Sequence, residues 1–105
     1  MPACLEIKQT LSGEIRTYPC ELLHFEPGFG ILRYVVDRTY DIQDFRLAPG
    51  DETIALYWEA RPYTLYIWKT MTGEMAHYFN IADSIALSAG EFIWRDLVVD
   101  ILVDR

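Results

Sequence analysis

The chain has 105 residues, of which 51% are apolar and 24% are charged, a composition typical of one globular domain that can bury a core of its own. Its formal net charge of −7 and its scattered lysines and arginines exclude a protein that tracks a nucleic-acid backbone, so DNA is not an expected partner and RNA is disfavoured. No uncharged apolar run approaches the ~20 residues of a membrane span, and the N-terminus has no basic and apolar leader. We therefore expect a cytoplasmic protein with no membrane partner.

Short runs rich in aromatic and β-branched residues alternate with glycine-containing turns along the whole chain. We place strands at 4–11, 14–25, 30–36, 42–47, 52–60, 64–71, 74–82 and 92–103. The segment 84–89 is the one that could form a helical turn. This pattern predicts an all-β, mainly antiparallel sandwich or barrel with little or no helix. The clearest hairpin has its turn at Thr72-Gly73, where glycine tolerates a positive φ.

The second predicted strand contains Arg16, in the run EIRTYP. Long cations in strands commonly lie along the protein surface. A guanidinium also offers a planar fork of donors that matches phosphate oxygens. Both interpretations of Arg16 stay open on these grounds.

Aromatic residues gather around the corner that we expect at Arg61-Pro62, in the run YWEARPYTLYIW. These rings are most simply core residues, although a ring at this place could also stack on a nucleotide base. As candidate substrate-binding residues we keep Trp58, Arg61, Tyr63, Trp68 and Lys69.

Polar residues interrupt the apolar strands of the C-terminal third. Asn80, the only asparagine, lies in HYFNIAD as either a turn former or a functional amide. In WRDLVVDILVDR, alternation puts Asp96 and Asp100 on one face and Val99 and Ile101 on the other, which we expect to be the core face. The aspartates are either a solvated strand edge or a functional pair. Four residues of straight strand span ~13 Å, so one shared ion requires a bulge, a bridging water or a second ion.

From Trp58 to Val103, the runs WEARPYTLYIWKTMTGEMAHYFNIAD and FIWRDLVVDIL resemble the FomD-like proteins, domain-of-unknown-function family 402. The resemblance covers most of the chain and implies a single small FomD-like β-barrel domain over 1–105. It implies divalent-metal-dependent hydrolysis of phosphoanhydride bonds in nucleoside di- and triphosphates or related nucleotidyl compounds. The metal ligands that it implies for Mg²⁺ or Mn²⁺ are Asn80, Asp96 and Asp100. It also implies that Arg16 is a catalytic residue, contacting phosphate or protonating the leaving group.

Two departures separate the chain from that family pattern. Val98 stands where many relatives have a central aspartate, and the chain ends at Arg105, where relatives continue through an acidic segment and a C-terminal helix. We therefore expect a shortened ligand set and keep two functional alternatives. The first is a metal-dependent nucleotide phosphohydrolase, whose partner is a nucleotide. The second is a degenerate, non-catalytic nucleotide- or RNA-binding module, and both are compatible with a homodimer.

Overall fold

The computed structural model of the chain describes residues 2–104 and consists of strands joined by short turns. The strands are β1 (Ala3–Gln9), β2 (Ile15–Glu26), β3 (Phe29–Val35), β4 (Tyr40–Ile42), β5 (Phe45–Leu47), β6 (Glu52–Trp58), β7 (Tyr63–Lys69), β8 (Met75–Leu87) and β9 (Glu91–Asp104). Residues 2–104 form no helix, and hence none long and apolar enough to cross a membrane. The predicted all-β class is confirmed.

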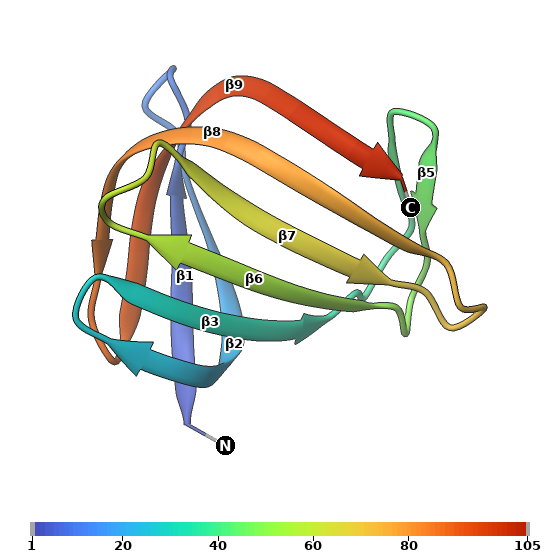
Figure 1. The fold of residues 1–105 in the computed structure, drawn as a ribbon, viewed down its shortest axis with the longest axis horizontal. Helices are drawn as coiled ribbons and strands as arrows, with labels where there is room; N and C mark the ends of the chain where they lie inside the picture. Colours follow the sequence, from blue (N-terminus) through green and yellow to red (C-terminus); the bar gives the residue numbers. More distant parts are fainter. Residues whose placement is uncertain (1, 105) are drawn as a thin grey trace.

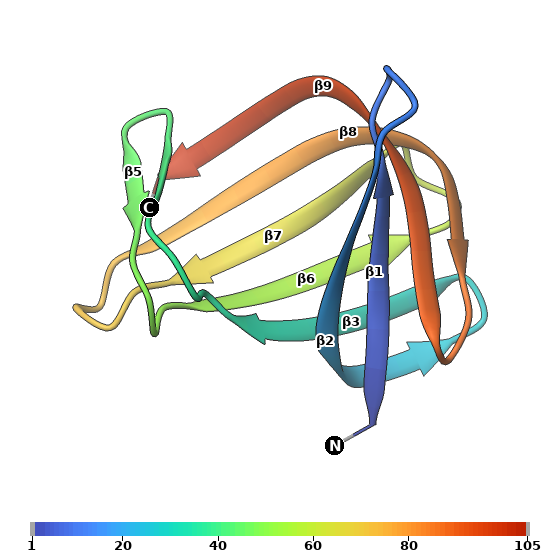
Figure 2. The same cartoon turned by 180° about the vertical axis from the view of Figure 1, so that it is seen from behind.

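Most of the strands close into a barrel in the order β1-β2-β3-β6-β7-β8-β9 (Figure 1). Neighbours in this order pair antiparallel, except that β1 and β9 run parallel and close the barrel, as Figure 2 shows from behind. Their register puts Leu5 opposite Glu91 and Gln9 opposite Arg95. Because β1 ends at Gln9, β9 continues from Asp96 onward past its last β1 partner.

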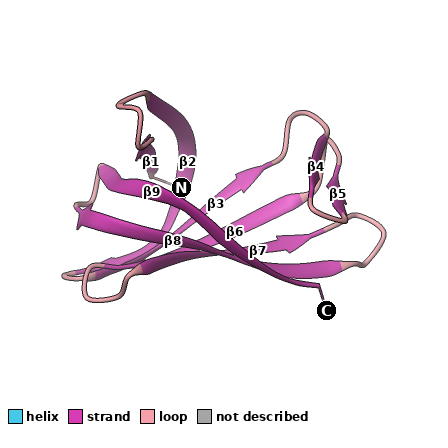
Figure 3. Cartoon of the chain, turned by 90° about the horizontal axis from the view of Figure 1, so that it is seen from above, coloured by secondary structure: helices cyan, strands magenta, loops and turns pink. Residues whose placement is uncertain are grey.

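A small hairpin of β4 and β5 stands apart from the barrel strands (Figure 3). The single strand predicted at 42–47 is therefore wrong, because the chain reverses after Ile42, with Gln43 at a φ of 54°. The apolar residues on both sides of the turn imitate one alternating strand. The hairpin packs on the barrel through Phe45, whose ring stacks on Trp68 with centroids 6.0 Å apart.

Strand β8 runs on through Leu87, so the helical turn predicted at 84–89 is wrong. Ser84 has a φ of 54°, and the register with β9 shifts between Asp83 and Ala86. Irregularities of this kind bend a strand without ending its pairing. The predicted hairpin of β7 and β8 is confirmed.

Large aromatic side chains fill the barrel interior. Tyr57, Phe92 and Trp94 are fully buried, and the rings of Tyr57 and Phe92 meet edge to face with centroids 5.1 Å apart. Gly30 on β3 makes room for the Phe92 ring, since a Cβ at this position would lie 2.2 Å from the Phe92 Cζ. Each such buried side chain contributes about 1.5–3 kcal/mol, so these rings hold opposite walls of the barrel together.

The two faces of β9 are the reverse of those predicted. Val99, Ile101 and Val103 point outward, with 57%, 51% and 41% of their surface exposed. Asp100, on the alternate face, lines a cavity inside the barrel. The prediction assumed that the apolar face of a strand covers the core, whereas this part of β9 borders a cavity whose walls include polar side chains.

Candidate functional site

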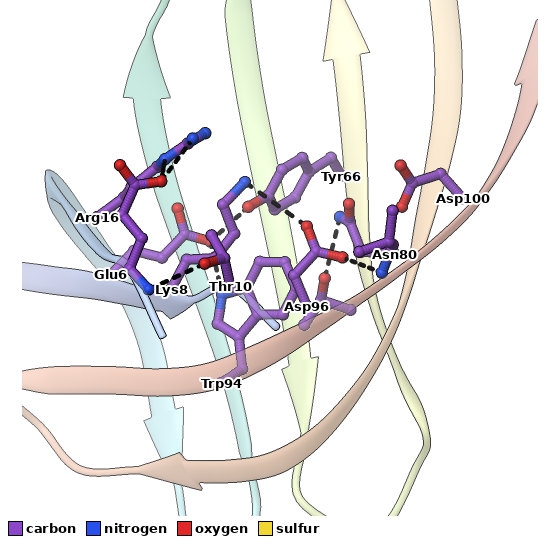
Figure 4. Close-up of polar contacts among 12 residues, drawn as sticks. Glu6, Lys8, Thr10, Arg16, Tyr66, Asn80, Trp94, Asp96 and Asp100 are labelled. Atoms are coloured by element: carbon purple, nitrogen blue, oxygen red, sulfur yellow. Dashed lines mark hydrogen bonds and ion pairs between the residues drawn. The ribbon is translucent and has the colours of Figure 1, made fainter. Parts of the chain in front are cut away.

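A cavity of about 370 Å³ lies inside the barrel and reaches the β4–β5 hairpin. The four residues predicted for metal binding and catalysis all line it: Arg16 from β2, Asn80 from β8, and Asp96 and Asp100 from β9. Figure 4 shows these side chains together with Lys8 and Glu6 of β1. The structure thus brings together residues from both ends of the chain.

A bulge in β9 lets Asp96 and Asp100 line the same cavity. Asn80 pairs with Asp100 and Ala82 pairs with Asp96, so a step of two residues on β8 faces a step of four on β9. The extra residues bulge out at Val98, which has a φ of 70° and is 68% exposed. The bulge shortens the ~13 Å separation that a straight strand would impose, which was one of the three arrangements required for a shared ion.

Asp100 has one carboxylate oxygen without a partner. Its Oδ2 accepts a hydrogen bond of 2.5 Å from the Tyr78 hydroxyl. Its Oδ1 is buried and has no hydrogen-bond partner among the residues described. Burial, followed by the hydrogen bond and charge of Asp100, raises the pKa of Tyr78, so this hydroxyl stays protonated and continues to donate. A buried oxygen without a donor is costly unless a ligand satisfies it.

The Asn80 amide is held by its nitrogen. Asn80 is 3% exposed, and its Nδ2 donates to the Thr64 Oγ1 at 3.1 Å, across the β7–β8 ladder in which the two residues are opposite one another. Asn80 also lies beside β9, where it pairs with Asp100. Because the nitrogen is engaged, the amide oxygen is the end that can serve a ligand.

Lys8 on β1 is a cavity residue that the sequence-based prediction missed. Its Nζ lies 3.9 Å from the Asp96 Oδ2, and 5.6 and 5.9 Å from the ring centroids of Trp94 and Tyr18. The other oxygen of Asp96 accepts the Val98 N–H at 2.8 Å. The sequence gives no signal for this position, because in the run LEIK alternation assigns Leu5 and Ile7 to the core face and Lys8 to the outer one. The structure shows the reverse, with Leu5 39% exposed.

Glu6, which was also missed, is fully buried behind the cavity wall. Its Oε2 accepts hydrogen bonds from the hydroxyls of Tyr57 and Tyr66, both at 2.5 Å, and from the Trp94 Nε1 at 3.1 Å. Burial, and then the charge of Glu6, raises the pKa of both tyrosines well above the ordinary value. One carboxylate therefore fixes three rings, of which Tyr66 lines the cavity.

Arg16 is exposed at the edge of the cavity and is engaged by Glu14, which directly precedes β2. Its Nε and Nη2 donate to the Glu14 Oε1 at 3.2 and 2.8 Å, and this hydrogen bond raises the pKa of Arg16. About half of each side chain is exposed, 53% for Arg16 and 58% for Glu14. An ion pair this exposed is weak, so a phosphate could displace Glu14 at little cost.

The candidate substrate-binding residues divide between two places. Trp68 lines the cavity, whereas Trp58, Arg61 and Tyr63 form a separate cluster. In that cluster the Arg61 guanidinium lies 4.5 Å from the Trp58 ring centroid, and the rings of Trp58 and Tyr63 meet edge to face at 5.6 Å. Lys69 is exposed and is not among the residues that line the cavity.

The fit of this site to Mg²⁺ or Mn²⁺ depends on few ligands. Within residues 2–104, no three histidine, cysteine, aspartate or glutamate side chains are grouped closely enough to hold a metal ion. The unpartnered Asp100 Oδ1 and the neighbouring Asn80 amide nevertheless suit a hydrated ion, because Mg²⁺ usually takes one or two carboxylates and completes its shell with water and substrate phosphate. These donors therefore suit a metal ion that enters the cavity already bound to the phosphate groups of a substrate.

No family model and no curated protein matches the sequence. Among solved structures, the chain is similar to one described as the complex structure of FomD with CDP, with a TM-score of 0.73 and 12% sequence identity. The match covers 98% of this chain and 62% of that chain, so the protein spans about three fifths of the length of this neighbour. The barrel therefore has a FomD-like fold, as the sequence resemblance implies.

Proposed function

We propose that the protein binds a nucleotide by its phosphate groups in this cavity and hydrolyses a phosphoanhydride bond with the help of Mg²⁺ or Mn²⁺. The supporting observation is the convergence of Arg16, Asn80, Asp96 and Asp100 on one cavity of a FomD-like barrel. The ligand named for the solved neighbour, CDP, is a nucleoside diphosphate of the proposed substrate class.

The charges around the cavity explain why a cation is part of the proposal. Asp37, Asp96 and Asp100 line the cavity together with two basic residues, Lys8 and Arg16. A diphosphate brings further negative charge to this wall, so binding requires a cation between phosphate and carboxylate. When bound, the ion would neutralise charge on the phosphate oxygens. Asp100 through its Oδ1, Asn80 through its amide oxygen, and Asp96 would hold it.

The other residues position the substrate and the ligands. Arg16 would exchange Glu14 for a phosphate and bind two of its oxygens at once, which stabilises charge on the group being transferred. Tyr78 would hold the Asp100 carboxylate in place by its hydrogen bond.

A non-catalytic nucleotide- or RNA-binding module is the second candidate. It is favoured by the surroundings of Asp96 and Asp100, because protein groups face three of their four oxygens. A binding module needs the cavity but does not need converging metal ligands.

A panel of nucleoside di- and triphosphates, incubated with the protein in Mg²⁺, Mn²⁺ or EDTA, tests the proposed function by phosphate release. We expect metal-dependent release from at least one nucleotide, and none in EDTA. Nucleotide binding by calorimetry without release under any condition would favour the binding module. Absence of both would contradict the phosphohydrolase and the nucleotide-binding form of the second candidate.

A further inference from the structure

Lys8 is one of only two lysines in the chain and the only one that lines the cavity, since Lys69 lies outside it. Its side chain is 18% exposed. Figure 4 shows the ammonium directed toward the Asp96 carboxylate. Lys8 and Asp96 come from β1 and β9, the strands that close the barrel.

The Lys8 ammonium is short of hydrogen-bond acceptors. An ammonium has three N–H donors, and it is costly to bury when they are unmet. Its salt-bridge partner, the Asp96 Oδ2, is 3.9 Å away, beyond ordinary hydrogen-bond length. The rings of Trp94 and Tyr18 offer only their faces to the charge. The cavity beside it is where an acceptor could enter.

We propose that Lys8 is a phosphate ligand that exchanges partners: it neutralises Asp96 while the cavity holds no nucleotide, and it binds a phosphate oxygen when a nucleotide enters. This inference rests on the proposed function, and it extends that function to a residue outside the implied ligand set. The exchange frees the Asp96 carboxylate for the divalent cation that accompanies the phosphate.

The exchange predicts two effects of opposite sign when Lys8 is replaced by methionine, which keeps much of the apolar stem. Without nucleotide, the ammonium repels a divalent cation at Asp96, so its removal should strengthen binding of the metal alone. With nucleotide, the phosphate loses a charged donor worth about 1.5–3 kcal/mol, or roughly 10–150-fold in affinity. A residue that only supports the fold would not separate the two effects in this way.

Calorimetry on the wild type, Lys8→Met and the matched control Lys69→Met tests this. The probes are Mn²⁺ alone, pyrophosphate with Mn²⁺, and CDP with Mn²⁺. In Lys8→Met we expect Mn²⁺ alone to bind severalfold more tightly, and pyrophosphate and CDP to bind at least tenfold more weakly. The control should match the wild type with all three probes.

A measurement on the unaltered protein covers the case in which Lys8→Met does not fold. With lysine labelled by ¹³C at Cε, the two lysines give two NMR signals. Addition of pyrophosphate with Mg²⁺ should shift the Lys8 signal and leave the Lys69 signal in place. An unmoved Lys8 signal at saturating pyrophosphate overturns the inference.

The outcomes separate this inference from the proposed function. If the wild type binds CDP and Lys8→Met binds it equally well, Lys8 is not a phosphate ligand, and the proposed function stands. If the wild type binds neither CDP nor pyrophosphate, the proposed function is wrong and the phosphate role of Lys8 is overturned with it. If Mn²⁺ alone binds Lys8→Met no more tightly than the wild type, the pairing of Lys8 with Asp96 does not oppose the metal, and the exchange is overturned.

Discussion

The backbone N–H of Val98 donates to the Asp96 Oδ1 at 2.8 Å, and this bond spans the point where β9 departs from regular strand geometry. Val98 has a φ of 70°, a conformation that β-branched residues rarely adopt. The same local turn orients the carboxylate of Asp96 and sets Asp96 and Asp100 on one cavity. Backbone strain in β9 and the position of the site are therefore linked.

Val98→Gly should stabilise the protein or leave it unchanged. Glycine adopts the left-handed conformation without strain, which raises the free energy of unfolding by about 1–2 kcal/mol. Glycine also gives the unfolded chain more conformational freedom, which offsets about 0.5–1 kcal/mol of that increase. We expect the melting temperature to rise by up to roughly 5 °C. Val99→Gly, at an outward position without positive φ, is the control and should lower it. Equal losses in the two variants would show that Val98 is not strained.

Glu6→Ala should cost at least about 3 kcal/mol of the free energy of unfolding. It leaves three buried donors, those of Tyr57, Tyr66 and Trp94, without their acceptor, and each unmet donor costs about 1–3 kcal/mol. Glu6→Gln keeps an acceptor oxygen and should cost less. Urea denaturation measures both, with the exposed Glu14→Ala as the control. A loss no greater than that of Glu14→Ala would rule out the proposed role of Glu6.

Stability should fall as the pH rises above 10. The pKa of Tyr57 is raised by burial and by Glu6, from an ordinary value of 10.0, so the folded state retains a proton that the unfolded state loses. The contribution of the protonated Tyr57 hydroxyl to the free energy of unfolding is complete below pH 10. It is lost as the pH rises from 10 toward the higher pKa of the folded state. Tyr57→Phe should lower the slope of unfolding free energy against pH by up to about 1.4 kcal/mol per unit. Unfolding in urea at pH 9 to 11 gives the slope, with Tyr40→Phe for comparison; identical slopes in all three proteins would contradict the expectation.

On the proposed function, metal and nucleotide together should raise the melting temperature, because both would bind only the folded cavity. At about 100 times the dissociation constant the gain is about 2.7 kcal/mol, or on the order of 10 °C. Asp100→Asn should abolish this increment without lowering the ligand-free melting temperature, since it replaces a buried oxygen that has no partner. The exposed Asp44→Asn should keep the increment. A full increment in Asp100→Asn would remove Asp100 from the ligand set.

Arg16→Lys should lower turnover by roughly tenfold or more, because a single ammonium cannot reproduce two-point contact with phosphate. Arg16→Ala should lose at least as much. Steady-state phosphate release compares them with Arg38→Lys, an exposed arginine that does not line the cavity. Full activity of Arg16→Lys would indicate that Arg16 is a surface cation.

Local patterns were enough to predict most of the strands. Turn glycines and alternating apolar runs located the hairpin of β7 and β8, because both signals are local. They failed at 42–47, where two polar residues form a turn inside an alternating run, and at 84–89, where a bend imitates a helical turn. The parallel pair of β1 and β9 leaves no local signal, because it joins the two ends of the chain.

The site was predicted only in part, for a related reason. Asn80, Asp96 and Asp100 stood out as polar residues in apolar strands, and the family resemblance connected them. Lys8 and Glu6 did not stand out, because charged residues near a terminus are expected to be exposed. Their inward position depends on barrel closure and on the aromatic donors that other strands supply.

The parallel pairing of the first and last strands also determines when the cavity can form. Lys8 on β1 is synthesised before every other strand of the barrel, and Asp96 on β9 after them, so both walls of the site exist only once β9 has been made. Closing so long a loop is slow compared with forming hairpins, and contacts between distant residues are among the last to assemble. A nascent chain on the ribosome can therefore fold its central hairpins early, but it cannot hold a ligand in this cavity before β9 has been made.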